Sequence, residues 1–173
     1  MSDTIIESGM KFIADNSFRI EKSSVYSQLG RNIKSVEFVR SMGNKLLFIE
    51  AKSSFPNPNN LSPSPHKDFK TGSELFQEEI DNIYDKFIHS LNLYAAIAIG
   101  VAKMGFPQEY IPPTKSSILF ILVINSFEKS WCLDVEIALM KKIHESICMN
   151  KIWKVKVHVI NHETAIKQNL AVE

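Results

Sequence analysis

The chain has 173 residues, enough for one domain with a full hydrophobic core. Hydrophobic residues make up 45% and charged residues 23%, as in an ordinary soluble protein, and no apolar run reaches the ~18–20 residues that span a bilayer. The net charge of +1 counts against a protein that binds nucleic acid through a strongly basic overall surface. The first residues lack the basic and apolar regions of a signal peptide, so we expect a cytoplasmic protein that does not act at a membrane.

The N-terminal third is predicted to contain one helix followed by three strands. Residues 4–14 are predicted to form an amphipathic helix, and residues 18–21 a first strand. Strands at 33–40 and 45–53 are predicted to pair as a hairpin, because a Gly-Asn pair between them tolerates the positive φ angles of a tight turn.

The remainder is predicted to alternate helices with apolar strands after a long loop. The loop covers residues 53–72 and holds four of the seven prolines. A loop of this length is often functional, so it is either a wall over a site or a plain surface insert. The elements predicted after it are a main helix at 73–103, a continuously apolar strand at 117–124, a helix at 131–149, an alternating edge strand at 153–160 and a short final helix through Leu170.

Both cysteines, Cys132 and Cys148, fall in the predicted helix at 131–149. Sixteen residues of helix would separate them by about 24 Å. This distance is far beyond the roughly 7 Å between Cα atoms that a disulfide allows. The spacing therefore indicates two free thiols, in agreement with a reducing compartment.

The pleat of the second hairpin strand gathers charged side chains on one face. Alternate residues of a strand point to opposite faces, so Glu50 and Lys52 share a face. We expect Arg40 to lie opposite Lys45 in the hairpin. This register places Glu37 on the same face as Glu50, at a diagonal distance of about 7–8 Å. The opposite face is apolar and is expected to pack on helices; it consists of Val36, Phe38, Leu47, Ile49 and Ala51.

Two carboxylates at this spacing suit a divalent metal ion. Mg²⁺ prefers oxygen ligands and is often held by one or two carboxylates together with a substrate phosphate. We therefore expect Mg²⁺ or Mn²⁺ to bind Glu37 and Glu50, with the backbone carbonyl of Ala51 as a third oxygen ligand. Lys52 would then neutralise a phosphate or assist the attacking water.

At these residues the chain resembles the PD-(D/E)xK nuclease superfamily. Glu50-Ala51-Lys52 corresponds to the (D/E)xK element, and Glu37 stands where the family usually has an aspartate. In members similar to Holliday-junction resolvases a further glutamate lies in the first helix, and Glu7 matches it. The chain departs from the pattern because the usual acid is an aspartate, often after proline, whereas Glu37 follows Val36.

The resemblance implies a restriction-endonuclease-like α/β fold and a metal-dependent nuclease. The fold would have a mixed central β-sheet flanked by helices, an αβββαβ core and an added αβ unit, all in one domain over residues 1–173. The implied activity is an endonuclease or exonuclease acting on DNA, with RNA as the alternative substrate. Its catalytic residues would be Glu7, Glu37, Glu50 and Lys52. Small nucleases of this build often pair to address two strands, so a homodimer is a reasonable expectation.

A different interpretation stays open beside this one. An E-x-K triplet is common, and on an exposed strand it is usually a solvated ion pair that contributes less than about 1 kcal/mol. The glutamate at position 37 and the near-neutral net charge both agree with a catalytically inactive relative. Such a protein would act as a nucleic-acid-binding or assembly subunit.

Overall fold

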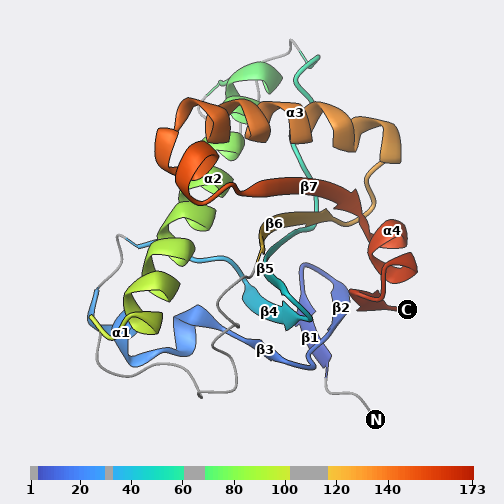
Figure 1. Ribbon diagram of the computed structural model, residues 1–173. Coiled ribbons are helices and arrows are strands. Elements are labelled where there is room, and N and C mark those ends of the chain that lie inside the picture. Colours follow the sequence, from blue (N-terminus) through green and yellow to red (C-terminus); the bar gives the residue numbers. More distant parts are fainter. Residues whose placement is uncertain (1–3, 30–32, 61–68, 102–116) are drawn as a thin grey trace.

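Helices cover a central mixed β-sheet in this α/β protein, as predicted (Figure 1). The computed structural model describes residues 4–29, 33–60, 69–101 and 117–173. The strands are β1 (Thr4–Glu7), β2 (Met10–Ile13), β3 (Ser17–Phe18), β4 (Phe38–Met42), β5 (Lys45–Lys52), β6 (Ser117–Ile124), β7 (Lys156–Asn161) and β8 (Ala171–Val172). The helices are η1 (Ile20–Lys22), α1 (Ser24–Gln28), α2 (Gly72–Ala98), α3 (Lys129–Glu145), η4 (Cys148–Ile152) and α4 (His162–Lys167).

The five-stranded sheet has the order β3-β4-β5-β6-β7. Strands β3, β4 and β5 pair antiparallel, whereas β5, β6 and β7 pair parallel. The parallel pairs are joined by crossovers through α2 and α3, as parallel pairing requires. A second, antiparallel sheet has the order β1-β2-β8, so segments from the two ends of the chain lie side by side.

The two faces of the large sheet pack against different layers. On one face, side chains of β5 and β6 meet α2 and α3, and the ring of Phe87 stacks on Phe120 at 4.5 Å while Phe48 meets Phe120 edge-on. On the other face, Phe38 packs on Phe12 of the small sheet at 5.3 Å. Burying one such ring stabilises the fold by about 1.5–3 kcal/mol. Strand β5 lies at the centre of the sheet, and its side chains from Leu46 to Ala51 are buried on both faces.

The elements with the strongest hydrophobic periodicity lie where they were predicted. Strand β6 covers residues 117–124, and the side chains from Phe120 to Ile124 are buried. The main helix begins at Gly72 and ends at Ala98, earlier than the predicted residue 103. The predicted apolar stripe of α2 packs on the sheet and consists of Phe76, Ile80, Ile83, Phe87, Leu91, Tyr94 and Ala98.

The predicted helix at 4–14 is wrong, because these residues form the β1–β2 hairpin. Ser8 and Gly9 form its turn with φ angles of 51° and 75°, which suit a two-residue hairpin connection. Met10 and Phe12 alternate with outward-facing residues and are fully buried. Their burial depends on β8 and on the large sheet, which lie far away in the sequence.

Several predicted boundaries also change. The strand predicted at 18–21 is the two-residue β3 followed by η1, and β4 begins at Phe38 rather than residue 33. The helix predicted at 131–149 ends at Glu145, so Cys148 lies in the separate η4 while Cys132 lies in α3. Both thiols are free, as predicted. Strand β8 was not predicted.

The predicted proline-rich loop is described only in part. Residues 53–60 and 69–71 are loop, and residues 61–68 lie outside the described residues. In the described part, Phe55 packs against Phe76 of α2 with ring centroids 5.5 Å apart. Within the described ranges, no helix is long and apolar enough to cross a bilayer.

Replacing Gly72 by alanine is expected to destabilise the protein by about 1–3 kcal/mol, because a Cβ atom would lie 2.1 Å from the carbonyl oxygen of Asn57. Urea unfolding followed by circular dichroism measures this loss. Ser73→Ala, at the next and exposed position of α2, is the matched control and should change the free energy of unfolding by less than about 0.5 kcal/mol. Equal stability of the two variants would contradict the packing of this loop on α2.

Candidate functional site

The hairpin of β4 and β5 sets the positions of the two candidate metal ligands. Met42 pairs with Lys45 across a two-residue turn in which Gly43 has a φ of 60°. The predicted pairing of Arg40 with Lys45 is therefore wrong by two residues. Because the shift is even, the side chains of β4 and β5 keep the faces that were predicted for them.

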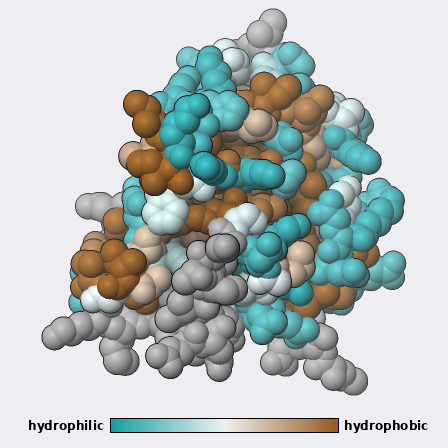
Figure 2. Space-filling model, viewed as in Figure 1, coloured by the Kyte–Doolittle hydropathy of each residue, from teal (hydrophilic) through white to brown (hydrophobic). Residues whose placement is uncertain are grey.

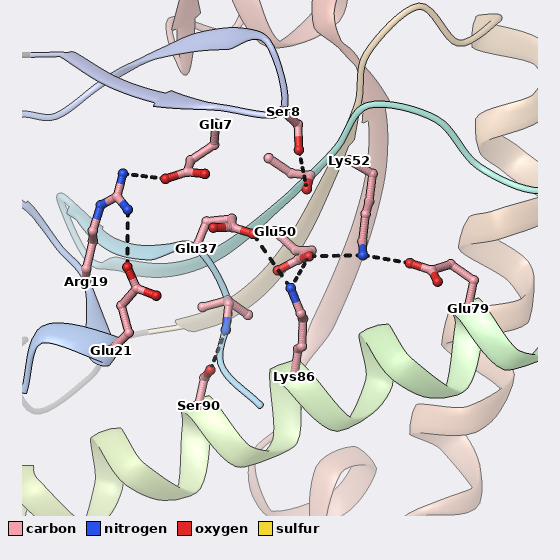
Figure 3. A network of polar contacts seen from close by, with 12 residues as sticks. Glu7, Ser8, Arg19, Glu21, Glu37, Glu50, Lys52, Glu79, Lys86 and Ser90 are labelled. Atoms are coloured by element: carbon pink, nitrogen blue, oxygen red, sulfur yellow. Dashed lines mark hydrogen bonds and ion pairs between the residues drawn. The ribbon is translucent and has the colours of Figure 1, made fainter. Parts of the chain in front are cut away.

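Glu37 lies directly before β4 and shares the α2 side of the sheet with Glu50 (Figure 3). The neighbouring Val36 is an exception to the expected alternation, because it joins the core on the α2 side. Its backbone N–H donates a hydrogen bond of 2.9 Å to Oγ of Ser90, a fully buried residue of α2. The other apolar side chains of the opposite face, Phe38, Leu47, Ile49 and Ala51, pack mainly on the small sheet and α4, not on the long helices as expected.

Lys86 of α2 holds the two carboxylates together. Its Nζ atom lies 2.6 Å from Oε1 of Glu50 and 3.6 Å from Oε1 of Glu37. These two oxygens therefore lie no further apart than the sum of the two distances. Two oxygens bound to one Mg²⁺ lie at most about 4 Å apart, so a small movement of the two side chains would let both bind the same ion. The side chains of Glu37 and Lys86 are 23% and 22% exposed, so solvent reaches the cluster from their side.

Lys52 joins the same cluster from the end of β5. Its Nζ atom lies 2.7 Å from Oε1 of Glu79 and 3.7 Å from Oε1 of Glu50. The predicted placement of Lys52 on the face of Glu50 is therefore what the structure has. Glu79, on the second turn of α2, holds the Lys52 ammonium group at the C-terminal end of β5 (Figure 3).

Glu7 also reaches this cluster, although it lies at the end of a strand and not in a helix. Its carboxylate pairs with the guanidinium of Arg19, which contacts Oε1 of Glu21 at 3.2 Å. Glu7 is close enough to Glu37 to raise the pKa of that carboxyl by charge repulsion and hydrogen bonding. The structure thus brings together Glu7, Glu37, Glu50 and Lys52.

The turn between β1 and β2 docks on the ends of two central strands. The hydroxyl of Ser8 donates to the backbone carbonyl of Ala51 at 2.9 Å, and the side chain of Asn125 donates to the carbonyl of Ser8 at 3.2 Å. These bonds hold the turn against the sheet. Glu7, which directly precedes Ser8, is held beside the sheet with it. The Ala51 carbonyl has a second lone pair, so it retains capacity for one more contact.

Glu50 is the least solvated member of the cluster, with a side-chain exposure of 0%. Burial raises the pKa of Glu50 to about 7, although the ammonium groups of Lys86 and Lys52 act in the opposite direction. Its Oε1 atom receives both lysines, whereas Oε2 is buried without a hydrogen-bond partner. A buried carboxylate oxygen without a donor is costly, and a proton or a bound cation would satisfy it.

Burial and neighbouring charges also shift the pKa values of Glu37 and Lys86. Burial also raises the pKa of Glu37, and the nearby Glu7 and Glu21 add to this shift while Lys86 opposes it. Burial alone would lower the pKa of Lys86, but the carboxylates of Glu50 and Glu37 outweigh it and raise that pKa. Both shifts favour a bound proton: burial is the main cause for Glu37, whereas the surrounding carboxylates are the cause for Lys86. The same carboxylates would also stabilise a cation bound among them.

The sequence patterns did not indicate Lys86 and Glu79 as members of the cluster. Both lie beside the apolar stripe of α2, where a lysine or glutamate is ordinary, so their residue types alone did not mark them. Their spacing of seven residues places them on one side of the helix, and the buried Ser90 follows Lys86 by one turn. Three polar residues aligned in this way along a buried helix are the signal that was available.

The donor set fits a hard divalent ion held by few protein ligands. Among the residues that the structure describes, no three or more His, Cys, Asp or Glu residues form a group that could hold a metal ion. Mg²⁺ commonly binds through one or two carboxylates and completes its shell with water or phosphate. Glu37, Glu50 and the Ala51 carbonyl supply oxygen donors of this kind, and the Oε2 atom of Glu50 has no hydrogen-bond partner.

Comparison of the chain with protein-family models, curated proteins and solved structures finds no match. The resemblance to the PD-(D/E)xK superfamily therefore rests on the motif residues and on the order β4-β5-α2-β6 around them, and it stays a prediction. The first helix of the expected αβββαβ order is absent from the described residues, because residues 4–13 form the β1–β2 hairpin.

Protein without added metal is expected to lose stability as the pH rises from about 5.5 to 7.5. The folded-state pKa of Glu50, about 7, lies above its ordinary value of 4.5, so the folded protein keeps a proton that the unfolded chain releases. The stabilisation is complete below pH 4.5 and is lost as the pH rises through 7. Over the measured interval this group alone contributes a loss of about 2 kcal/mol.

Urea unfolding at several pH values tests this expectation. Glu50→Gln removes the titrating group, so the variant should show a smaller loss across the interval than the wild-type protein. Glu163→Gln, on the exposed part of α4, is the control and should behave like wild type, because Lys167 lowers the pKa of the Glu163 carboxyl and keeps it ionised across the interval. Parallel pH profiles for wild type and Glu50→Gln would contradict the raised pKa.

Proposed function

We propose that the chain is a metal-dependent nuclease that hydrolyses phosphodiester bonds, with DNA as the expected substrate and RNA as the alternative. One observation carries the proposal: Glu37 and Glu50 converge on a single cationic position, with Lys52 beside them at the end of a central strand. A carboxylate pair next to an ammonium group suits a metal ion and a phosphate bound together.

Each member of the cluster has a distinct part in this proposal. Glu37, Glu50 and the Ala51 carbonyl would hold Mg²⁺ or Mn²⁺. The bound ion would supply Lewis acidity and lower the pKa of a water molecule. Lys52 neutralises the phosphate and is oriented by Glu79 at 2.7 Å. Arg19 pairs with Glu7, so the Glu7 carboxylate would add little negative charge to the metal site.

An aromatic cavity beside Lys52 supports a nucleic-acid substrate. Phe55 follows Lys52 by three residues, and Phe76 precedes Glu79 by one helical turn. With Phe127 and Trp131, these rings line a cavity of about 170 Å³ at the same end of the sheet. Unstacked bases stack on accessible aromatic rings, at about 1–3 kcal/mol for each base. Among the rings that line this cavity, Trp131 is 46% exposed and offers such a surface. A nucleotide whose phosphate contacts Lys52 would have its base near this cavity.

The second candidate is a catalytically inactive protein of the same build that binds nucleic acid or assembles with a partner. The position of Lys86 favours it. Its ammonium group lies between Glu37 and Glu50, where a shared ion would bind, and supplies the positive charge that these carboxylates need. Metal binding requires this side chain to move, whereas an inactive protein would keep it in place.

Cleavage of labelled single-stranded DNA, double-stranded DNA and RNA in Mg²⁺ or Mn²⁺ separates the two candidates. A nuclease should lose activity in EDTA, and Lys52→Ala should reduce the rate by roughly 10²–10³-fold, because one charge that stabilises the transition state is removed. Lys45→Ala, at the exposed opposite end of β5, is the matched control and should retain the wild-type rate.

Two outcomes would count against the nuclease proposal. Cleavage that persists both in EDTA and in Lys52→Ala would come from another site or a contaminant. Binding of nucleic acid without cleavage in either metal would favour the inactive candidate.

Removing the charge of Lys86 should strengthen metal binding. Lys86→Met deletes the cation that competes for Glu37 and Glu50, so calorimetry should show Mn²⁺ affinity increased by roughly tenfold or more. Lys34→Met, which removes an exposed ion pair with Asp85 one residue away on α2, should leave the affinity unchanged. Adding Glu50→Gln to Lys86→Met should abolish the gain, and an unchanged affinity in all variants would place the metal elsewhere.

A further inference from the structure

Helix α3 has two apolar faces, of which only one is covered. Its inner face is buried on the sheet and consists of Cys132, Val135, Leu139 and Ile143. On the outer face, Leu133 and Ile137 are 59% and 57% exposed, and Met140 is also exposed. Figure 2 shows hydrophobic side chains along α3 and at the end where the chain turns toward β7.

Further exposed apolar side chains lie in the segment that follows α3. Ile147, Ile152 and Trp153 follow α3 directly in the chain and are 75%, 69% and 37% exposed. Monomeric proteins rarely leave large side chains clustered in water, and such clusters usually mark an interaction surface. Among these exposed side chains, those on the outer face of α3 are the most regular, because they follow a helical repeat.

We propose that the outer face of α3 is the interface of a homodimer, in which the helix packs antiparallel on α3 of a second copy. Leu133, Ile137, Met140 and His144 are spaced by four, three and four residues. This is the spacing of the two core positions of a coiled coil, whose side chains meet those of a facing helix. The interface needs no residue of the candidate active site, so it is independent of the proposed function.

The charges beside the stripe identify a second copy as the partner. Asp134 and Lys141 are both exposed and directly follow the core positions Leu133 and Met140. In an antiparallel pair centred between Ile137 and Ala138, Asp134 of one copy lies opposite the partner's Lys141, and the reverse contact forms by symmetry. One surface thus carries both halves of a complementary pair, as a two-fold interface requires.

Both charges are available for such contacts. Among the described residues, neither Asp134 nor Lys141 forms an ion pair within its own chain. The adjacent Lys142, in contrast, pairs with Asp81 of α2 and lies over the ring of Tyr84 at 5.9 Å. These contacts hold α3 on the body of the protein, so its outer face is presented on a rigid element. Antiparallel packing also sets the two helix dipoles in a favourable arrangement.

Sedimentation velocity over a wide range of protein concentrations tests the interface. The wild-type chain should sediment with twice its monomer mass of 19.7 kDa at high concentration. Ile137→Glu should weaken association at least tenfold, because it places two carboxylates in the centre of the stripe. Ile99→Glu, at a 75% exposed position after α2, is the control and should leave association unchanged. Circular dichroism and thermal unfolding confirm that each variant is folded.

Charge exchange tests the antiparallel arrangement itself. Asp134→Lys and Lys141→Asp should each weaken the dimer, because each places like charges opposite one another. The double variant Asp134→Lys with Lys141→Asp should restore it. A monomer at every concentration, a dimer insensitive to Ile137→Glu, or a double variant weaker than both single variants would overturn the proposal.

Discussion

The contact between the Glu50 carboxylate and the Lys86 ammonium group constrains the rest of the structure. Glu50 lies on the central strand with no exposed surface, and breaking a buried pair by removing one partner typically costs about 3–5 kcal/mol. Strand β5 must therefore present Glu50 where α2 presents Lys86, and α2 must cross the sheet at that point. The stacking of Phe87, the next residue along α2, on Phe120 fixes the same crossing by apolar packing. An ion pair at Lys86 and an aromatic contact at Phe87 thus fix the position of α2 on the sheet at two adjacent residues.

The hydrophobic periodicity of the sequence was sufficient to predict the helices and strands whose buried side chains recur at regular intervals. Strand β6 is apolar without interruption, and α2 repeats its apolar side chains every three or four residues, so each pattern allows one secondary structure. The clustering of Glu37, Glu50 and Lys52 was predictable for a similar reason. Side chains alternate along a strand, so a predicted register that was wrong by two residues still placed Glu37 on the correct face.

Contacts between distant segments were not predictable in this way. The hairpin at residues 4–13 is too short to reveal its period against a helical alternative, and its strand character depends on pairing with β8. Lys86 could not be assigned to the cluster before the crossing of α2 over β5 was known. The same holds for Ser8, whose contact with Ala51 joins positions 43 residues apart. In each case tertiary packing decides what local propensity leaves open.

The pairing of β2 with β8 links the hairpin that carries Glu7 to a segment far away in the sequence, because Lys11 and Phe12 lie opposite Val172 and Ala171. Such long-range pairing raises the contact order of the fold, and folding rates fall as contact order rises. A substitution that disrupts β8 would therefore also act on the acidic corner next to Arg19, although the two are far apart in the sequence.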